Sequence, residues 1–196
     1  MAPELPITTE RLVLRGFTLA DLDDLVMLCG QTDAQRYLTH PARDRADIQS
    51  ALDAMGQQKG LNRPGDVLCL AVVRQADRRL VGKLSLTWTD ATAAQAELNF
   101  LFAPSLRTQT DPAEALRTML DLAFESFGFH RVFTRCGVRS EGSIELLKRL
   151  GMRLEAHYRE HALFQGEWDE ELHFAVLDRE WLRGSAVKEL NQHRVA

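Results

Sequence analysis

The stretch "LRTQTDPAE", from Leu106 to Glu114, follows a run of apolar residues and precedes a long amphipathic segment. A loop between a strand and a helix often holds a phosphate, through glycine backbone N–H groups and the N-terminus of the helix. This loop carries threonine, aspartate and proline instead, which are typical of a helix start with Thr110 or Asp111 as N-cap and Pro112 in the first turn. The stretch is therefore interpreted either as an anion site or as a helix start that caps itself.

A second stretch of chemical interest is "HYREH", His157 to His161, which matches the H-x-x-E-H signature of certain zinc peptidases. That chemistry needs both histidines on one turn of a helix. The neighbouring residues alternate as in a strand, in which residues four apart are separated by about 13 Å and cannot share one zinc ion. We therefore expect no metal site.

Length and composition restrict the class of protein. The chain has 196 residues, 45% of them hydrophobic and 27% charged, as expected for one globular domain. No apolar run approaches the roughly 20 residues of a membrane span, and the acidic, proline-containing start differs from a secretory signal. The net charge is −4 and the basic residues are scattered, which argues against nucleic acid as a partner. We expect a cytoplasmic monomer or homodimer that binds small or peptide-like ligands and no membrane.

The cysteines and several aromatic residues are expected to be structural. Cys29, Cys69 and Cys136 are odd in number, distant in sequence and surrounded by apolar residues, so we expect reduced core thiols rather than a redox or nucleophilic site. A set of aromatic residues is expected to pack in the core rather than to form a ligand cage. They are Phe124, Phe127, Phe129, Trp168 and Trp181.

Hydrophobic periodicity predicts one domain over residues 1–183 and a C-terminal tail over residues 184–196. Alternating or continuous apolar runs predict strands at 11–17, 67–74, 80–88, 96–102, 130–138, 154–164 and 170–177. Apolar stripes at helical spacing predict helices at 19–29, 44–58, 112–127 and 141–150. The resulting order is β-α-α-β-β-β-α-β-α-β-β, with an antiparallel meander at its centre.

Four stretches, in this order and spacing, resemble the GNAT superfamily of acyl-CoA-dependent N-acyltransferases, and within it the RimJ/RimL-type acetyltransferases of protein N-termini. They are "ITTERLVLRGFTLADLDDL", "AELNFLFAPSLR", "LDLAFESFGFHRVFTRCGVRSEGSIELLKRLGM" and "HALFQGEWDEELHFAVLDREW". The resemblance implies an α+β fold with a mostly antiparallel sheet of about seven strands and helices on both faces. It also implies that the fourth and fifth strands are parallel and diverge.

The same resemblance implies an activity, the transfer of an acetyl group from acetyl-CoA to a primary amine such as a protein N-terminus or a small amine. In the family, backbone N–H groups of the fourth strand polarise the thioester carbonyl, and those of the following loop bind the cofactor pyrophosphate. The residues that match these positions are Asn99, Phe100 and Leu101 in the strand, and Arg107, Thr108, Gln109, Thr110 and Asp111 in the loop.

Two side chains are candidates for proton transfer. Glu97, at the head of the fourth strand, would take a proton from the attacking amine; the alternative is an ordinary solvent-facing strand residue. Ser143, as the serine of the family pattern N-x-x-S, would return a proton to the leaving thiolate; the alternative is a local hydrogen bond in the first turn of a helix. Ser140 stands at the asparagine of that pattern and is a candidate cofactor contact.

The loop departs from the family pattern Q/R-x-x-G-x-G/A. Arg107 matches the first position, but Thr110 and Pro112 stand at the two small-residue positions, and proline has no N–H to donate. Asp111 adds a negative charge next to the expected phosphates. The alternative function is therefore a degenerate GNAT-fold protein that binds a ligand or a partner without acyl transfer.

Overall fold

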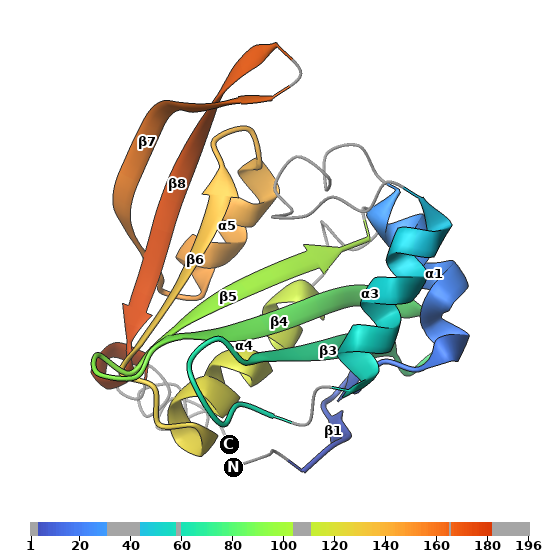
Figure 1. Cartoon of the computed structure of the whole chain (residues 1–196). Coiled ribbons are helices and arrows are strands. Elements are labelled where there is room, and N and C mark those ends of the chain that lie inside the picture. The colour runs from blue at the N-terminus through green and yellow to red at the C-terminus, as the bar shows by residue number, and fades with distance from the viewer. Residues whose placement is uncertain (1–3, 31–43, 58–59, 104–110, 165, 182–196) are drawn as a thin grey trace, which may run out of the picture.

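The fold is built on one sheet of eight strands, in the order β1-β2-β3-β4-β5-β6-β8-β7 (Figure 1). The computed structural model describes residues 4–30, 44–57, 60–103, 111–164 and 166–181. Neighbouring strands are antiparallel except for β5 and β6, which run parallel. The α+β fold with a mostly antiparallel sheet is thus confirmed. The strands are β1 Ile7–Thr8, β2 Leu12–Arg15, β3 Val67–Arg74, β4 Leu80–Asp90, β5 Gln95–Phe102, β6 Arg131–Gly137, β7 Arg153–Phe164 and β8 Glu167–Leu177.

Helices cover both faces of this sheet (Figure 1). On one face, Leu25 and Ile48 are buried in a cluster that α1 and α3 form with the sheet. On the other face, Met119 and Leu147 are buried in a cluster that includes α4 and α5. The order of elements follows the sequence prediction, with the short β1 added. The helices are α1 Leu22–Cys29, α3 Arg45–Gln57, α4 Asp111–Asp121 and α5 Glu141–Arg149, with a 3-10 turn η1 at Leu19–Asp21 and a π-helical segment η3 at Leu122–Ser126.

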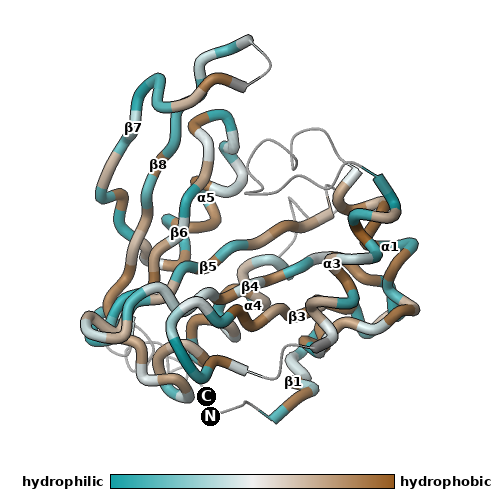
Figure 2. Tube along the Cα trace, in the orientation of Figure 1, coloured by the Kyte–Doolittle hydropathy of each residue, from teal (hydrophilic) through white to brown (hydrophobic). Residues whose placement is uncertain are grey.

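Strand β3 explains why helices are needed on both sides. Its sequence VLCLAVVR is apolar at nearly every position, and every residue between its ends is buried. Leu68, Leu70 and Val72 belong to the cluster with α4, whereas Cys69 and Ala71 belong to the cluster with α1 and α3. A continuous apolar strand requires cover on both faces. Figure 2 shows this hydrophobic centre beside a β7–β8 hairpin of more mixed polarity.

Strands β5 and β6 pair over a short stretch and then diverge (Figure 1). Their registered pairs are Gln95–Arg131, Ala96–Val132 and Glu97–Phe133. Beyond these pairs, β5 continues beside β4 as far as Phe102, and β6 continues beside β8 as far as Gly137. The expected parallel, diverging pair of strands is therefore confirmed.

The β7–β8 hairpin extends past the end of β6 and corrects one core prediction. β6 and β8 pair up to Gly137 and Glu171, whereas β7 and β8 stay paired up to Phe164 and Glu167. Trp168 lies in this overhanging part and is 58% exposed, so it is not a core residue. Alternation along a strand indicates which residues share a face, but not whether a neighbouring strand reaches far enough to help cover them. The other aromatic residues follow the prediction: Phe127 packs against the core, and Phe124, Phe129 and Trp181 are buried.

Several smaller expectations can also be compared with the fold. All three cysteines are buried and in no disulfide among the described residues, as predicted, and burial raises the pKa of Cys136 to about 11. The expected helix over 112–127 divides into α4 and the π-helical segment η3. Residues 184–196, the expected tail, lie outside the described residues. In the described part of the chain, no helix has the length and apolar character needed to span a membrane.

Candidate active site

The diverging end of β5 turns one backbone donor toward β6. Successive N–H groups of a strand point to opposite edges. Ala103 donates its N–H to the carbonyl of Val81 on β4, so the N–H groups of Asn99 and Leu101 also point to β4, and that of Phe100 points toward β6. The registered β5–β6 pairs end before Phe100. Of the three strand residues expected to polarise a carbonyl, Phe100 is the one whose N–H faces the divergence.

Glu97 is the last β5 residue that pairs with β6, and its carboxylate is bound by Arg135 of β6. Arg135 donates from Nε to Glu97 Oε1 at 2.7 Å, and Arg135 Nη2 lies 2.7 Å from the same oxygen. The Glu97 side chain is only 13% exposed. The side chain therefore makes a directed ion pair and is largely withdrawn from solvent.

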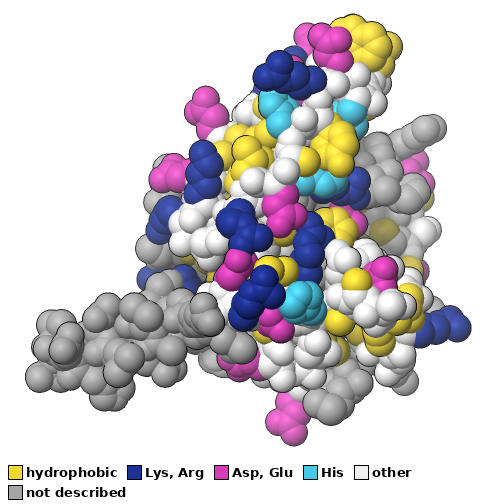
Figure 3. Space-filling model, turned by 90° about the vertical axis from the view of Figure 1, so that its left-hand side faces the viewer, with side chains coloured by type: hydrophobic (Ala, Val, Ile, Leu, Met, Phe, Trp, Pro, Cys, Tyr) yellow, Lys and Arg dark blue, Asp and Glu magenta, His cyan; other side chains and the backbone are white. Residues whose placement is uncertain are grey.

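Arg135 belongs to a row of polar side chains that crosses β5, β6 and β8. It is the register partner of His173 on β8, so the two side chains lie on one face of the sheet. Arg135 Nη1 lies 3.9 Å from Glu171 Oε1, and the same Glu171 oxygen lies 2.7 Å from His173 Nε2. The Tyr158 ring of β7 packs 4.5 Å from the His173 ring. Figure 3 shows the β7–β8 side of the molecule, where acidic, basic and histidine side chains are neighbours.

The two serines stand at the start of α5, directly after β6. Ser140 is the N-cap residue, and its backbone N–H donates to the carbonyl of Gly137 at 3.0 Å. Its hydroxyl makes no capping hydrogen bond. Ser143 follows in the first turn and is partly buried. The turn from Gly137 to Ser140 therefore brings the first turn of α5 next to the divergent end of β6.

The predicted catalytic residues lie on opposite faces of the sheet. Leu101, four residues after Glu97 and on the same face, packs with the α1–α3 cluster. Leu147 of α5 is buried in the α4 cluster on the other face, where Ser143 also lies. A group held between the diverging strands would have Glu97 on one side and Ser143 on the other.

Thr134 is a residue that the sequence did not single out. It follows the last β6 residue that pairs with β5, and it is fully buried on the face of Val132 and Cys136. Its hydroxyl has no hydrogen-bond partner in the part of the chain that the structure describes. A buried polar group without a partner is uncommon and costly. This hydroxyl therefore supplies an unused donor and acceptor beside the divergence.

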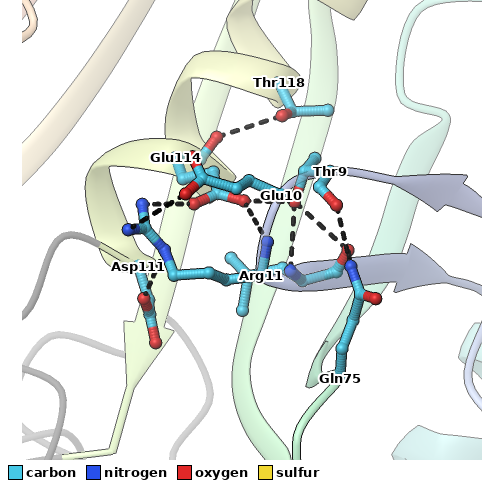
Figure 4. A network of polar contacts seen from close by, with 8 residues as sticks. Thr9, Glu10, Arg11, Gln75, Asp111, Glu114 and Thr118 are labelled. Carbon is cyan, nitrogen blue, oxygen red and sulfur yellow. Dashed lines mark hydrogen bonds and ion pairs between the residues drawn. The ribbon is translucent and has the colours of Figure 1, made fainter.

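The acidic start of α4 is engaged by Arg11, which follows β1 (Figure 4). Asp111, the first residue of α4, is 4% exposed, and Arg11 Nε lies 3.1 Å from its Oδ1. Arg11 also donates to Glu114, from Nη2 at 2.6 Å and from its backbone N at 2.9 Å. Thr9 Oγ1 donates to Glu114 Oε1 at 2.5 Å. These contacts join the N-terminal segment to the first turn of α4.

This network changes the electrostatic argument about the loop. Burial raises the pKa of Glu114, but hydrogen bonds from Thr9 and from the backbone and side chain of Arg11 outweigh it and hold the pKa below its usual range. Asp111, expected to repel phosphates, has its charge directed at Arg11. One guanidinium faces the carboxylates of Asp111 and Glu114, with that of Glu10 at 4.0 Å, so the cluster stays negative. Four loop residues proposed to hold the cofactor lie outside the described residues: Arg107, Thr108, Gln109 and Thr110.

The "HYREH" stretch is part of β7, as predicted. His157 Nε2 lies 2.5 Å from Glu170 Oε2, and the His161 ring lies 6.4 Å from the Tyr158 ring. Across the described ranges, no three His, Cys, Asp or Glu side chains are grouped so that they could hold a metal ion. The strand conformation therefore separates these histidines from the zinc-peptidase arrangement.

A family model described as an acetyltransferase (GNAT) domain matches residues 11–153. The chain belongs to the GNAT acetyltransferase family. The matched residues begin at Arg11, include β2 through α5, and end at the start of β7. They therefore contain Glu97, the divergent β5–β6 pair and both serines of α5.

Known acetyltransferases are similar to this protein over nearly the whole chain. YnaD of Bacillus subtilis (strain 168), described as an uncharacterized N-acetyltransferase, is 22% identical over 175 residues, which are 89% of this chain and 98% of YnaD. A GNAT-family acetyltransferase structure from Bacillus anthracis has a TM-score of 0.76 at 21% identity and covers 90% of this chain and 100% of that one. The structure of a candidate ribosomal-protein-serine acetyltransferase from Vibrio cholerae has a TM-score of 0.73 at 20% identity. It covers 90% of this chain and 99% of that one.

GNAT acetyltransferases generally use acetyl-CoA, and the described residues fit such a donor between β5 and β6. The Phe100 N–H and the buried Thr134 hydroxyl are polar groups that face or flank the divergence. Amide and thioester carbonyls need such partners when they leave water. The first turn of α4 fits phosphates less well, because Pro112 has no N–H and the Arg11 cluster remains negative.

Proposed function

We propose that this GNAT protein transfers an acetyl group from acetyl-CoA to a primary amine, with Glu97 as proton acceptor. The observation that carries the proposal is the position of Glu97, which lies where β5 and β6 stop pairing, three residues before Phe100, whose N–H faces the divergence. An amine attacks only in its neutral form, so a carboxylate at this point has a direct chemical use. Holding the amine and the thioester together supplies much of the acceleration in such a reaction.

The proposed roles account for each proton and bond. Glu97 takes one proton from the ammonium group, and the freed lone pair attacks the acetyl carbon. The carbonyl oxygen, which gains negative charge, would accept a hydrogen bond from the Phe100 N–H. The N–C bond forms and the C–S bond breaks as the nitrogen loses a second proton. That proton would pass to the hydroxyl of Ser143 on the opposite face while the hydroxyl gives its own proton to the leaving thiolate. The donor supplies an activated acetyl group; the protein supplies orientation and proton transfer.

The donor is proposed to be anchored by the loop before α4 and by the start of α5. The proposed contacts are the side chain of Arg107 and the backbone N–H groups of Thr108, Gln109, Thr110 and Asp111, together with Ser140. The N–H groups of Asn99 and Leu101 point to β4, so we propose Phe100 as the strand donor. Arg11 supports this proposal for Asp111, because it pairs with the carboxylate, and a backbone N–H in the first turn of a helix has no partner within the helix. Pro112 weakens the site by one donor.

The acceptor is proposed to be a protein N-terminus, as in RimJ/RimL-type enzymes, or a small amine. The similarity to a candidate ribosomal-protein-serine acetyltransferase of Vibrio cholerae supports this subtype. We further propose that residues 1–183 form the catalytic domain and that the protein works in the cytoplasm as a monomer or homodimer.

The test is a measurement of thiol release from acetyl-CoA with a panel of peptides and small amines, together with thermal melting. Acetyl-CoA should raise the melting temperature because a ligand that binds the folded state stabilises it. At least one amine should raise thiol release above the rate without acceptor. If acetyl-CoA raises the melting temperature and no acceptor releases thiol, the alternative of a degenerate GNAT-fold binding protein is correct. The negative Arg11 cluster and Pro112 at the start of α4 are the features that favour this alternative.

A further inference from the structure

Arg135 lies between two carboxylates and is bound closely to one of them. Its Nε and Nη2 are 2.7 Å from Glu97 Oε1, whereas its Nη1 is 3.9 Å from Glu171 Oε1. The Arg135 side chain is 38% exposed, so the surrounding core does not confine it to one position. The Glu97 side chain is only 13% exposed, so the accessible member of this pair is Arg135. A second cation next to Glu97 would repel Arg135 toward its second neighbour, Glu171.

Glu97 cannot serve as a proton acceptor while Arg135 is hydrogen-bonded to its carboxylate. An adjacent guanidinium favours the charged form of a carboxylate and uses its oxygen as a hydrogen-bond acceptor. The acceptor amine reaches the site as a cation at neutral pH. Two cations cannot share Glu97 Oε1 without repulsion, so the arrival of the ammonium group displaces Arg135.

Glu171 is arranged to receive the displaced side chain. His173 holds Glu171 Oε1 at 2.7 Å, and the Tyr158 ring packs against His173. Because Arg135 and His173 are register partners, Glu171 lies two residues along β8 from the residue opposite Arg135. Both carboxylates are thus within reach of the same guanidinium without any movement of the backbone.

We propose that Arg135 is a movable counter-ion of Glu97, a positioning residue that shifts to Glu171 when the acceptor amine binds. This inference rests on the proposed role of Glu97. After the shift, Glu97 takes one proton from the ammonium group, which forms an O–H bond and leaves the nitrogen lone pair free. The Arg135 guanidinium, which the protonated Glu97 no longer balances, stays paired with Glu171. His173 keeps the Glu171 carboxylate in position.

The kinetic test is a double-mutant cycle of Glu171→Gln and Arg135→Gln, measured by thiol release with the best acceptor. Glu171→Gln should lower kcat roughly fivefold with an unchanged KM for acetyl-CoA, because Arg135 then has no second anion. In the Arg135→Gln background, the same change should alter kcat by less than about twofold. Glu167→Gln is the matched control, since Glu167 pairs at 2.7 Å with Arg139 elsewhere on the hairpin. Circular dichroism melting verifies that each variant is folded.

A second measurement does not depend on turnover. Arg135 Nε–H donates to Glu97, so its exchange with water, followed by NMR, reports how often this bond opens. Glu171→Gln should slow the exchange, whereas Glu167→Gln should not. The proposal that Arg135 is shared would be overturned if Glu171→Gln changed kcat equally with and without Arg135. It would also be overturned if Glu171→Gln left the exchange rate of the Arg135 Nε–H unchanged. If the wild-type protein releases no thiol with any acceptor, the proposed function fails separately, and slower exchange would still establish the sharing of Arg135.

Discussion

Two clusters in this protein each place one arginine among carboxylates, and they differ in how completely the arginine is bound. Arg11 contacts Asp111 at 3.1 Å and Glu114 at 2.6 Å, and its own backbone N–H also binds Glu114. Arg135 contacts Glu97 at 2.7 Å but remains 3.9 Å from Glu171. The first arginine has both anions within contact distance, and the second has one.

The difference follows from what each cluster joins. The Arg11 cluster joins the N-terminal strands to the first turn of α4, where Asp111 is nearly inaccessible to water and Thr9 adds a further bond to Glu114. Buried charges need this degree of pairing. The Arg135 cluster lies where β5 and β6 separate, so a group placed between these strands would lie next to Glu97, although the Glu97 side chain is only 13% exposed. Similar residues therefore join two parts of the fold in one place, and in the other we propose that they prepare proton transfer.

The largest expected effect is on turnover, from a substitution in the Arg135 cluster. Glu97→Gln should reduce turnover by roughly 10²-fold because the amide cannot accept the amine proton. Steady-state thiol release would measure it, and the melting temperature should change little. A variant that keeps wild-type turnover would show that Glu97 is only an ion-pair partner of Arg135.

The matching change in the Arg11 cluster should act on stability. Glu114→Gln removes charge-assisted bonds from Arg11 and Thr9, so the free energy of unfolding should fall by about 1–2 kcal/mol. Urea denaturation followed by circular dichroism measures this difference. Turnover per folded molecule should stay at the wild-type value; a drop as large as that of Glu97→Gln would contradict the division into a structural and a catalytic cluster.

The same cluster predicts a dependence of stability on pH. The folded-state pKa of Glu114 is below its ordinary value of 4.5, so its stabilisation is present above that pH and is lost as the pH falls through the folded-state pKa. The wild type should therefore lose stability more steeply below about pH 4.5 than Glu114→Gln does. Denaturation at a series of pH values would compare the two. Parallel curves would mean that Glu114 contributes nothing through its charge.

Substitutions at the start of α4 and in the loop before it should have a smaller effect. Thr110→Gly combined with Pro112→Ala restores one N–H and frees the backbone, so acetyl-CoA should bind roughly fivefold more tightly. The double variant should be slightly less stable because Pro112 favours the start of a helix. Calorimetric titration decides the first point. Equal or weaker binding would mean that the start of α4 is no part of the donor site.

The smallest expected effect is that of Ser143→Ala. Turnover should fall by only about two- to threefold, because water can also protonate a thiolate. Ser140→Ala provides a comparison at the same end of α5, with an expected effect on the KM for acetyl-CoA instead. A loss for Ser143→Ala as large as that for Glu97→Gln would make Ser143 the principal proton-transfer group and not an assistant.

Local sequence patterns were sufficient to predict most of the strands and helices. The run VLCLAVVR predicted β3 at its observed bounds, and the stripe before Gly151 predicted α5 within one residue. The same alternation predicted a strand through "HYREH", which excluded a helical pair of zinc ligands. These successes share a cause, since hydrophobic periodicity and helix-end residues act over a few neighbouring positions.

By itself, the sequence determined the order of the elements, the parallel and diverging β5–β6 pair implied by the family resemblance, and the placement of Glu97 and Ser143 on different elements. Only the tertiary structure decided which charges meet. Arg135 reaches Glu97 and Glu171 because the β6–β8 register places it opposite His173, and Arg11 reaches Glu114 across 103 positions of sequence. Such contacts depend on register and on which strands are neighbours, and no local pattern contains that information.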